Sequence, residues 1–242
     1  LYPDPIYLVG AAGMGKSILA RMLAEAVGAL DRMHIIQGTQ GMRLEHAVGN
    51  WFPRSENGQV DLGWQDGAVT EALRCEGILL FEEISRAPDP VLDAMFPILD
   101  TDNRQFTLIS HENERIEIGS NFWLIATGNP TGGGYKTKEL DTALRSRFVA
   151  VYDFNKPVAD EKKILLNYVS EHVATEFLKI ATDLRRNDQT YINTRDLVNA
   201  ARLVSKSPLF DPLRAFEISV APKYPKMAAG IMETAKQLIT PD

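Results

Sequence analysis

The chain has 242 residues, 45% of them hydrophobic and 24% charged, the composition of a globular protein that buries a sizeable core. Its net charge of −6 argues against a uniformly basic nucleic-acid-binding surface, while leaving room for a local basic patch. The single cysteine, Cys75, allows neither an intrachain disulfide nor a cysteine zinc cage, and no apolar run is long enough to span a bilayer. With no signal peptide recognisable ahead of the first strand pattern, we expect a cytoplasmic protein.

The chain begins with the pattern of a strand, a turn and a helix. Residues 6–9 (IYLV) form a short apolar run that ends at Gly10, which is typical of a strand buried on both faces. Residues 17–27 then carry apolar side chains at helical spacing, and Gly28 is a stop signal.

Further segments have the apolar character of strands, and helical patterns separate most of them. The clearest helical pattern covers residues 90–99. Because strands alternate with helices, the sequence predicts a parallel sheet with helices on both faces. The four further strands are expected at residues 33–37, 77–81, 122–127 and 148–154.

Two segments interrupt this alternation. Residues 38–67 are rich in Gly, Asn and Trp and are too long for a plain connection. Residues 102–120 resemble a β-hairpin, with alternating apolar residues on two arms and a turn at residues 111–114.

After Pro157 the character of the sequence changes, because no further strand pattern follows. The remaining apolar residues have helical periodicity, punctuated by Asn, Pro and Ser. A small all-helical domain is the simplest interpretation. Its helices are expected at residues 160–184, 194–204, 212–220 and 226–239.

Residues 10–17 (GAAGMGKS) match G-x-x-x-x-G-K-[ST] between a predicted strand and a predicted helix, the context that gives this motif its meaning. Glycines let consecutive backbone N–H groups surround phosphate oxygens, and the helix N-terminus adds positive potential. Lys16 is expected to reach the β- and γ-phosphates, and the Ser17 hydroxyl to ligate Mg²⁺. The expected nucleotide-binding residues are Gly10, Ala11, Ala12, Gly13, Met14, Gly15, Lys16 and Ser17.

Two acids follow the third predicted strand, in residues 77–83 (GILLFEE). A parallel strand that ends in carboxylates places them at the sheet edge where ligands bind. We expect Glu82 to hold Mg²⁺ through its water shell, and Glu83 to orient or deprotonate the attacking water.

The segments after the phosphate loop resemble those of the AAA+ ATPases, in the same order. Residues 127–130 (TGNP) close the fourth strand, and the resemblance implies that Asn129 is sensor 1, which helps to place the lytic water. Residues 143–148 (ALRSRF) resemble the segment that supplies arginine fingers to a neighbouring subunit. This implies Arg147 as the first choice of finger and Arg145 as the second.

The helical region after Pro157 resembles the lid domain of the same family. Within it, residues 192–196 (INTRD) resemble the sensor 2 element. The resemblance implies that Arg195, at a helix start, reaches the γ-phosphate bound by its own subunit.

Within this class, the chain is most similar to the MoxR-like and dynein-related group, in the branch with an insert in helix 2. Residues 77–88 (GILLFEEISRAP) and 192–197 are typical of that group, and the resemblance covers essentially the whole chain. It implies an α/β fold: a three-layer αβα P-loop core with a five-stranded parallel sheet, followed by a small α-helical lid. The implied parts are the core (1–155), its helix 2 insert (38–67), its pre-sensor 1 hairpin (102–120) and the lid (156–242).

One residue departs from the family pattern, which has aspartate before the glutamate at the end of the third strand. Here the first acid is Glu82, whose side chain is one methylene longer. Because this acid contacts Mg²⁺ through water, we expect metal binding to survive, with a slower turnover as one consequence.

The insert carries three large aromatic residues, Trp51, Phe52 and Trp64. One interpretation places them along a ring pore or a partner groove. The other has them pack the insert onto its own domain.

The resemblance implies an ATP- and Mg²⁺-dependent ring, a homo-oligomer and most plausibly a hexamer, that remodels or activates a protein client. Proteins of this group commonly work with a von Willebrand factor A-domain partner, although no residue here identifies a client.

The sequence offers different support for three alternative functions. A nucleotide-gated scaffold with slow or no hydrolysis has the Glu82 substitution as its sequence support. A nucleic-acid motor is disfavoured by the acidic balance and the lack of a basic–aromatic patch. A GTPase is disfavoured because the chain has no N-K-x-D motif.

Overall fold

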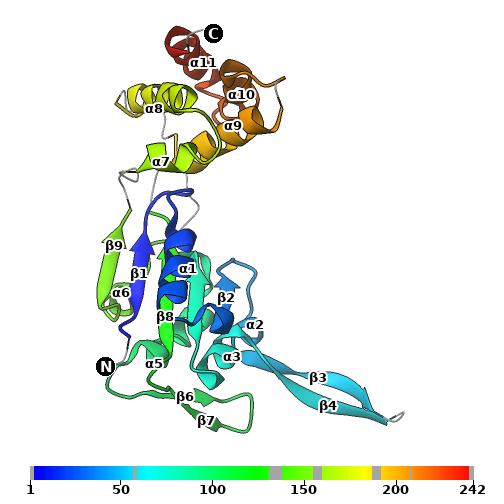
Figure 1. Ribbon diagram of the computed structural model, residues 1–242. Helices are drawn as coiled ribbons and strands as arrows, with labels where there is room; N and C mark the ends of the chain where they lie inside the picture. The colour runs from blue at the N-terminus through cyan, green and yellow to red at the C-terminus, as the bar shows by residue number, and fades with distance from the viewer. Residues whose placement is uncertain are drawn as a thin grey trace. The chain divides into compact units, whose positions relative to one another are not determined.

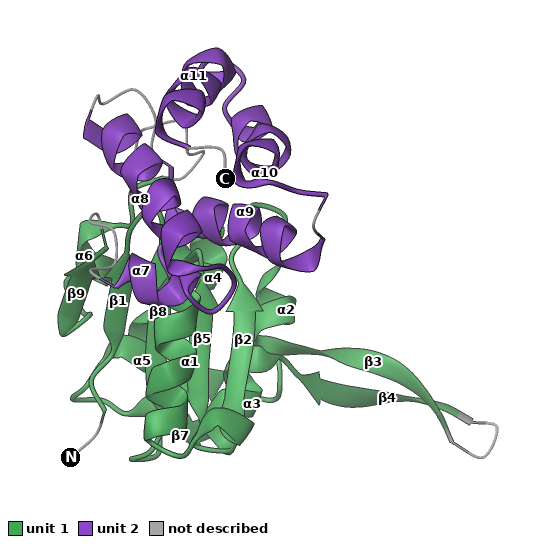
Figure 2. Cartoon of the chain, turned by 45° about the horizontal axis from the view of Figure 1, so that its top comes forward, with its two compact units in different colours: residues 1–10, 16–154 green, residues 11–15, 155–242 purple. Residues whose placement is uncertain are grey.

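The structure is a computed structural model that describes residues 3–56, 59–130, 138–154, 160–186, 192–207 and 209–239 (Figure 1). The chain divides into two compact units (Figure 2). The first unit comprises residues 1–10 and 16–154 and contains the described strands. The second comprises residues 11–15 and 155–242, and its described elements are helices. No described helix is both long and apolar enough to cross a membrane.

Five parallel strands form the main sheet of the first unit, in the order β2-β5-β8-β1-β9 (Figure 1). Each corresponds to an expected strand, so the predicted α/β fold is confirmed. Because β5, β8 and β1 are consecutive in the sheet, their carboxyl ends lie side by side at one edge. The strands are β1 (Ile6–Val9), β2 (Met33–Gln37), β5 (Ile78–Glu82), β8 (Trp123–Gly128) and β9 (Ala150–Asp153).

Alternate side chains of the strands enter separate cores on the two faces of the sheet, as the two-residue period of a strand requires. In β5, Leu79 and Phe81 belong to one core, whereas Ile78 and Leu80 belong to the other. Helix α1 packs small alanines into the second core, and α3, α4 and α5 contribute to the first. The sheet therefore has helices on both faces. The helices are α1 (Lys16–Ala26), α3 (Ala68–Arg74), α4 (Asp89–Asp93), α5 (Phe96–Leu99) and α6 (Thr142–Arg145).

The insert contains helix α2 (Leu44–Val48) and a long hairpin of β3 (Gly49–Glu56) and β4 (Gln59–Asp66), which projects from the sheet (Figure 1). These strands are not among those expected from the sequence, although residues 60–64 (VDLGW) alternate apolar and polar side chains. Val60 is 76% and Leu62 60% exposed, so the apolar side chains at these two positions do not form a face buried in the core.

The second expected hairpin is present, as β6 (Gln105–Leu108) paired with β7 (Glu114–Glu117). The single helix expected over residues 90–99 is wrong, because α4 and α5 are separate. Pro97 lies in the first turn of α5 and has no N–H to donate, so it cannot continue the hydrogen-bond ladder of α4.

The second unit packs helices around its own core, in which the rings of Phe177 and Phe216 lie 4.9 Å apart. The helix expected over residues 160–184 is wrong as a single element. It is two helices, because α8 starts afresh after Ser170, whose side-chain oxygen accepts a bond from the Val173 amide. The helices are α7 (Glu161–Leu165), α8 (Glu171–Arg186), α9 (Thr194–Lys206), α10 (Pro212–Ser219) and α11 (Ala228–Leu238).

Candidate active site

The glycine-rich loop begins where β1 ends and leads into α1. The Gly10 amide donates to the Gly128 carbonyl over 3.1 Å, which ties the loop to the neighbouring strand β8. Gly13 and Gly15 have φ angles of 81° and 88°, in the left-handed region that favours glycine. The loop therefore takes a conformation that other residues would adopt only with strain. Of the remaining predicted loop residues, those buried are Ala11 and Met14, and those partly exposed are Ala12 and Ser17.

Lys16 and Asn129, predicted from separate motifs, lie in contact. The Lys16 Nζ atom donates to the Gly10 carbonyl over 2.6 Å and to Asn129 Oδ1 over 3.2 Å. Lys16 and Asn129 are each only 8% exposed. The contact arises because β1 and β8 are parallel neighbours, with Val9 opposite Gly128.

The backbone before Asn129 is fixed by close packing. A Cβ atom on Gly128 would lie 2.1 Å from the Tyr7 hydroxyl, so a larger residue would have to displace the Tyr7 ring. Tyr7 is itself buried against Phe148, with ring centroids 5.3 Å apart, and this burial raises its pKa. Glycine at position 128 thus leaves room for the buried Tyr7 ring beside the residue that precedes Asn129.

The two acids at the end of β5 have different surroundings. Glu82 is the last residue of the strand, and its carbonyl accepts a 2.7 Å bond from the Gly38 amide. Glu83 has a left-handed backbone, with φ 50° and ψ 44°. Its amide donates to Thr127 Oγ1 over 3.1 Å, and its carboxylate accepts a 2.7 Å bond from Arg86. Sequence reasoning assigned roles to neither Thr127 nor Arg86, although both lie inside the motifs that it used.

The first unit also carries the oxygen ligands that Mg²⁺ prefers. Ser17 offers a hydroxyl in the first turn of α1, and Glu82 offers a carboxylate at the carboxyl edge of the sheet. Hard oxygen donors of this kind suit Mg²⁺, which retains several waters when bound to protein. The donor set fits the metal that the phosphate loop implies.

Arg145 and Arg147 lie on the exposed surface around α6, whose N-terminus is capped by the Asp141 side chain. The Arg147 guanidinium donates to the Ala143 carbonyl over 3.1 Å and sits 4.7 Å from the centroid of the Phe96 ring. Arg145 forms a loose ion pair of 3.9 Å with Glu139. Both residues are thus exposed on a structured segment.

Arg195 belongs to the second unit, in the first turn of α9. Asn193 caps this helix: its Oδ1 accepts a 3.0 Å bond from the Asp196 amide, and the Asp196 carboxylate accepts one from the Asn193 amide. Residues 11–15 group with this unit. A Cβ on Gly13 would lie 2.6 Å from Asn193 Oδ1 and 2.9 Å from Arg195 Cβ. The absence of a side chain at Gly13 lets the start of α9 approach the phosphate loop.

The matching family is the AAA domain of the dynein-related subfamily, whose profile covers residues 5–148. The chain belongs to this family of AAA+ ATPases. It is 26% identical to the denitrification regulatory protein NirQ of Stutzerimonas stutzeri over 208 residues, which cover 83% of this chain and 72% of that one. It is 27% identical to NirQ of Pseudomonas aeruginosa over 239 residues, covering 90% and 82%. It is also 29% identical to the protein NorQ of Paracoccus denitrificans over 160 residues, covering 64% and 55%.

These similarities make the chain a MoxR-like AAA+ ATPase, as the sequence motifs imply. The phosphate loop, both acids, Asn129 and Arg147 all lie within the matched residues 5–148. Arg195 lies outside them, in the helical unit.

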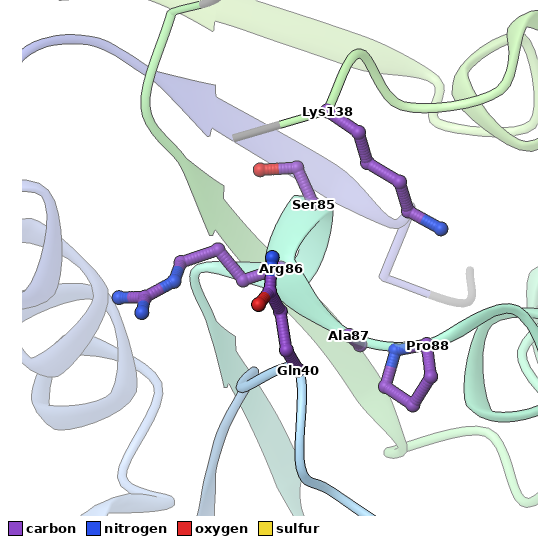
Figure 3. Close-up of a pocket in the computed structure, with 6 residues that line it drawn as sticks. All are labelled: Gln40, Ser85, Arg86, Ala87, Pro88 and Lys138. Atoms are coloured by element: carbon purple, nitrogen blue, oxygen red, sulfur yellow. The ribbon is translucent and has the colours of Figure 1, made fainter. Parts of the chain in front are cut away.

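A small cavity of about 150 Å³ lies beside the segment that follows Glu83 in the sequence (Figure 3). Figure 3 shows the Arg86 and Lys138 side chains extending in opposite directions from it. Each is paired with an acid, Arg86 with Glu83 and Lys138 with Asp89, so neither cation offers an unpaired charge. The cavity is lined by Gln40, Ser85, Arg86, Ala87, Pro88 and Lys138.

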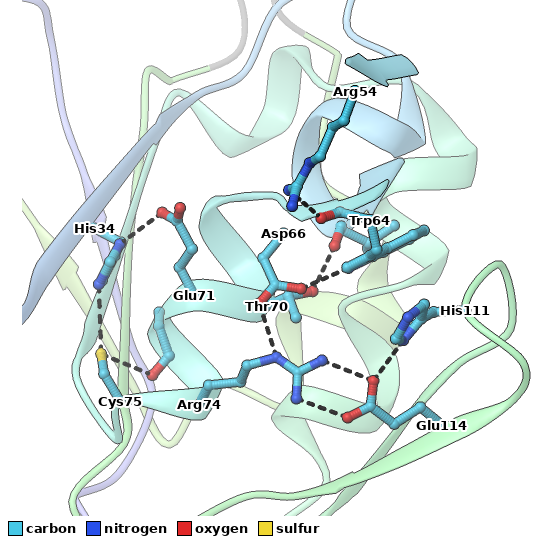
Figure 4. Close-up of polar contacts among 12 residues, drawn as sticks. His34, Arg54, Trp64, Asp66, Thr70, Glu71, Arg74, Cys75, His111 and Glu114 are labelled. Atoms are coloured by element: carbon cyan, nitrogen blue, oxygen red, sulfur yellow. Dashed lines mark hydrogen bonds and ion pairs between the residues drawn. The ribbon is translucent and has the colours of Figure 1, made fainter. Parts of the chain in front are cut away.

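Two of the three aromatic residues of the insert pack onto their own domain, and Figure 4 labels one of them, Trp64, together with His111. Trp51 donates from its indole to the Ser110 carbonyl over 3.0 Å, and the Trp64 ring stacks on His111 with centroids 4.6 Å apart. Ser110 and His111 belong to the turn of the β6–β7 hairpin. Phe52 remains 46% exposed. The packing interpretation therefore holds for Trp51 and Trp64.

Proposed function

We propose that this AAA+ ATPase hydrolyses Mg²⁺-bound ATP at the subunit interfaces of a hexameric ring, and uses the cycle to remodel or activate a partner protein. The observation that carries the proposal is the contact between Lys16 Nζ and Asn129 Oδ1, beside the strand that ends in Glu82 and Glu83. In this proposal Lys16 binds phosphate and Asn129 places the water, at the sheet edge where the neighbouring strand β5 ends in the two acids.

Each residue has a separate task in this proposal. When ATP binds, residues 10–17 enclose the phosphates and Lys16 neutralises charge on the β- and γ-oxygens. Ser17 and Glu82 would hold Mg²⁺, which would supply further neutralisation of the phosphate charge. Glu83 accepts the proton of the attacking water, or orients that water, while Asn129 helps to place it. Arg195 stabilises the γ-phosphate from the lid of the same subunit.

Phosphoryl transfer depends on positioned charge more than on covalent chemistry, so a missing cation has a large effect. A finger supplied by a neighbour contributes on the order of 10³–10⁵ in rate in related nucleotide hydrolases. Arg147, and next to it Arg145, are exposed cations on a capped segment and are suited to that role in a neighbouring site. Assembly would then be required for turnover.

A protein partner is suggested by the relatives, since NirQ carries the description of a denitrification regulatory protein. The β3–β4 hairpin, with Phe52, Val60 and Leu62 exposed, offers apolar surface for such a partner. A von Willebrand factor A-domain protein, the common companion in the MoxR-like group, is one candidate for that partner.

A phosphate-release assay on the assembled protein with ATP and Mg²⁺ tests the proposal. Replacing the base in Glu83→Gln should lower kcat by about 10²–10⁴-fold while the Kd for a fluorescent ATP analogue stays unchanged. The control is Glu25→Gln, which replaces an exposed carboxylate on helix α1 and should retain full activity. ATP binding by the wild-type protein without phosphate release would instead support a nucleotide-gated scaffold.

A further inference from the structure

The second unit buries two carboxylates that the proposed mechanism does not use. Glu161 is 5% exposed and Asp196 is 3% exposed, within a small helical core. Burying a charge costs free energy unless the group is paired and hydrogen-bonded, and a buried ion pair often adds little net stability. Their location suggests what they do, because both are bonded to the start of helix α9.

The first carboxylate anchors the residue before Arg195. Thr194 Oγ1 donates to Glu161 Oε1 over 2.6 Å. Arg185 binds the same carboxylate through both terminal nitrogens, at 2.7 and 2.9 Å, and its Nε donates to the Ile192 carbonyl over 2.8 Å. A bidentate pair of this kind fixes orientation as well as distance. Glu161 on α7 and Arg185 on α8 therefore hold the chain on both sides of the helix cap.

The second carboxylate is the residue after Arg195. Asp196 accepts a 2.7 Å bond from Lys223 Nζ and a 2.6 Å bond from the Tyr224 hydroxyl. It also closes the capping box through the Asn193 amide, at 3.2 Å. The segment after α10 thus holds this side of the turn.

Arg195 lies between these two anchors and is itself exposed, with its Cβ against the position of Gly13. Successive helix residues point about 100° apart, so fixing Thr194 and Asp196 fixes the rotation of the turn that carries Arg195. We infer that Glu161 and Asp196 are positioning residues that aim Arg195 at the phosphate loop. This inference rests on the proposed role of Arg195 as the γ-phosphate contact.

Two conservative variants on opposite sides of the turn test this role. Thr194→Val removes the hydroxyl that binds Glu161 at similar volume, and Tyr224→Phe removes the hydroxyl that binds Asp196. A displacement of about 1 Å in a catalytic constellation can cost about 10²-fold, so each should lower kcat between about 10- and 100-fold. Thr194→Ser keeps the hydroxyl and should therefore retain most of the wild-type kcat.

The decisive measurement is a double-mutant cycle with Arg195→Ala. If Glu161 and Asp196 act through Arg195, Thr194→Val and Tyr224→Phe should change kcat by less than about 2-fold in the Arg195→Ala background. The Kd for a fluorescent ATP analogue should rise in each single variant. It should not rise further when Thr194→Val or Tyr224→Phe is added to Arg195→Ala. Thermal unfolding confirms that each variant folds.

Other outcomes overturn the inference and are distinguishable. Losses that are equal in both backgrounds mean that the network only stabilises the helical unit. Full activity of both single variants means that the anchors are dispensable for aiming Arg195. An Arg195→Ala protein with unchanged kcat removes the premise, and with it the proposed role of Arg195 itself.

Discussion

Glu83 is held by two hydrogen bonds, one at its backbone amide and one at its carboxylate, and each has a distinct consequence for its proposed chemistry. Its left-handed backbone costs on the order of 1 kcal/mol for a residue other than glycine, so the surroundings must impose it. The bond from its amide to the buried Thr127 hydroxyl supplies one constraint. Arg86 binds one carboxylate oxygen, Oε2, through a single nitrogen. A contact of this kind directs the side chain while leaving the other oxygen to face a water molecule.

Thr127→Val should therefore lower kcat by roughly tenfold with little change in KM for ATP. It leaves the Glu83 amide without its partner, which costs about 1–3 kcal/mol and loosens the base without touching the phosphate loop. Thr127→Ser keeps the hydroxyl and serves as the matched control. Steady-state kinetics across an ATP titration separate the two parameters. A valine variant with wild-type kcat would show that the left-handed turn holds Glu83 unaided.

The two hairpins of the first unit, β3–β4 and β6–β7, are linked through the ion pairs of one arginine (Figure 4). Arg74, at the end of α3, pairs with Asp66 at the end of β4 and bidentately with Glu114 at the start of β7. His111 adds a further 2.7 Å contact to the same Glu114 carboxylate. Since α3 leads into β5 and β7 leads into β8, the fastened ends are continuous with the two strands that carry Glu83 and Asn129.

This fastening should make stability depend on pH. The hydrogen bond from Arg74, and next that from His111, lower the pKa of Glu114 from 4.5 to about 2. Because the folded pKa is the lower one, the stabilisation is complete above about pH 4.5 and is lost as pH falls towards about 2. Both partners are about one third exposed, so solvent screening limits the pair to about 1 kcal/mol.

Glu114→Gln should lower the thermal unfolding midpoint by about 2–4 °C at pH 7, and the difference from wild type should shrink below about pH 4.5. Melting curves at pH 7, 5, 4 and 3 measure this. Glu117→Gln, an exposed acid on the same strand β7, is the control and should track wild type throughout. A gap that stays constant with pH would mean that the charge of Glu114 contributes nothing.

The sequence predicts the five strands of the sheet and the motifs at their ends, because buried parallel strands are continuous apolar runs and glycine or acidic residues mark where they stop. The β3–β4 hairpin is not among the predicted elements: residues 60–64 (VDLGW) alternate apolar and polar side chains, but Val60 and Leu62 are exposed and not buried in a core. Nor does the sequence predict that Thr127 binds the Glu83 amide, a contact between residues 44 positions apart that depends on β5 and β8 being neighbours.

At the scale of the whole molecule, the proposed mechanism draws on groups in two different places on one chain. Lys16, Glu83 and Asn129 gather at its own sheet edge, whereas Arg147 is exposed and held by Ala143 and Phe96 of its own unit. In a closed ring with head-to-tail contacts, the same outward surface of every subunit meets the same site on its neighbour. We therefore expect each complete site to contain residues from two copies of the chain.

Mixing two inactive variants tests this division directly. Arg147→Ala should reduce turnover by about 10³–10⁵-fold with ATP binding nearly intact, and Glu83→Gln should be inactive as well. In a ring assembled from equal amounts of both, a Glu83 site of the first variant can face an Arg147 of the second. About a quarter of the sites in a randomly mixed ring are then whole, so phosphate release should recover to a measurable fraction of wild type. Mixing Arg145→Ala with Glu83→Gln and measuring phosphate release tests Arg145, the second choice of finger, in the same way. If Arg147 acts within its own subunit, every site in the mixture lacks one group, and phosphate release stays at the level of the separate variants.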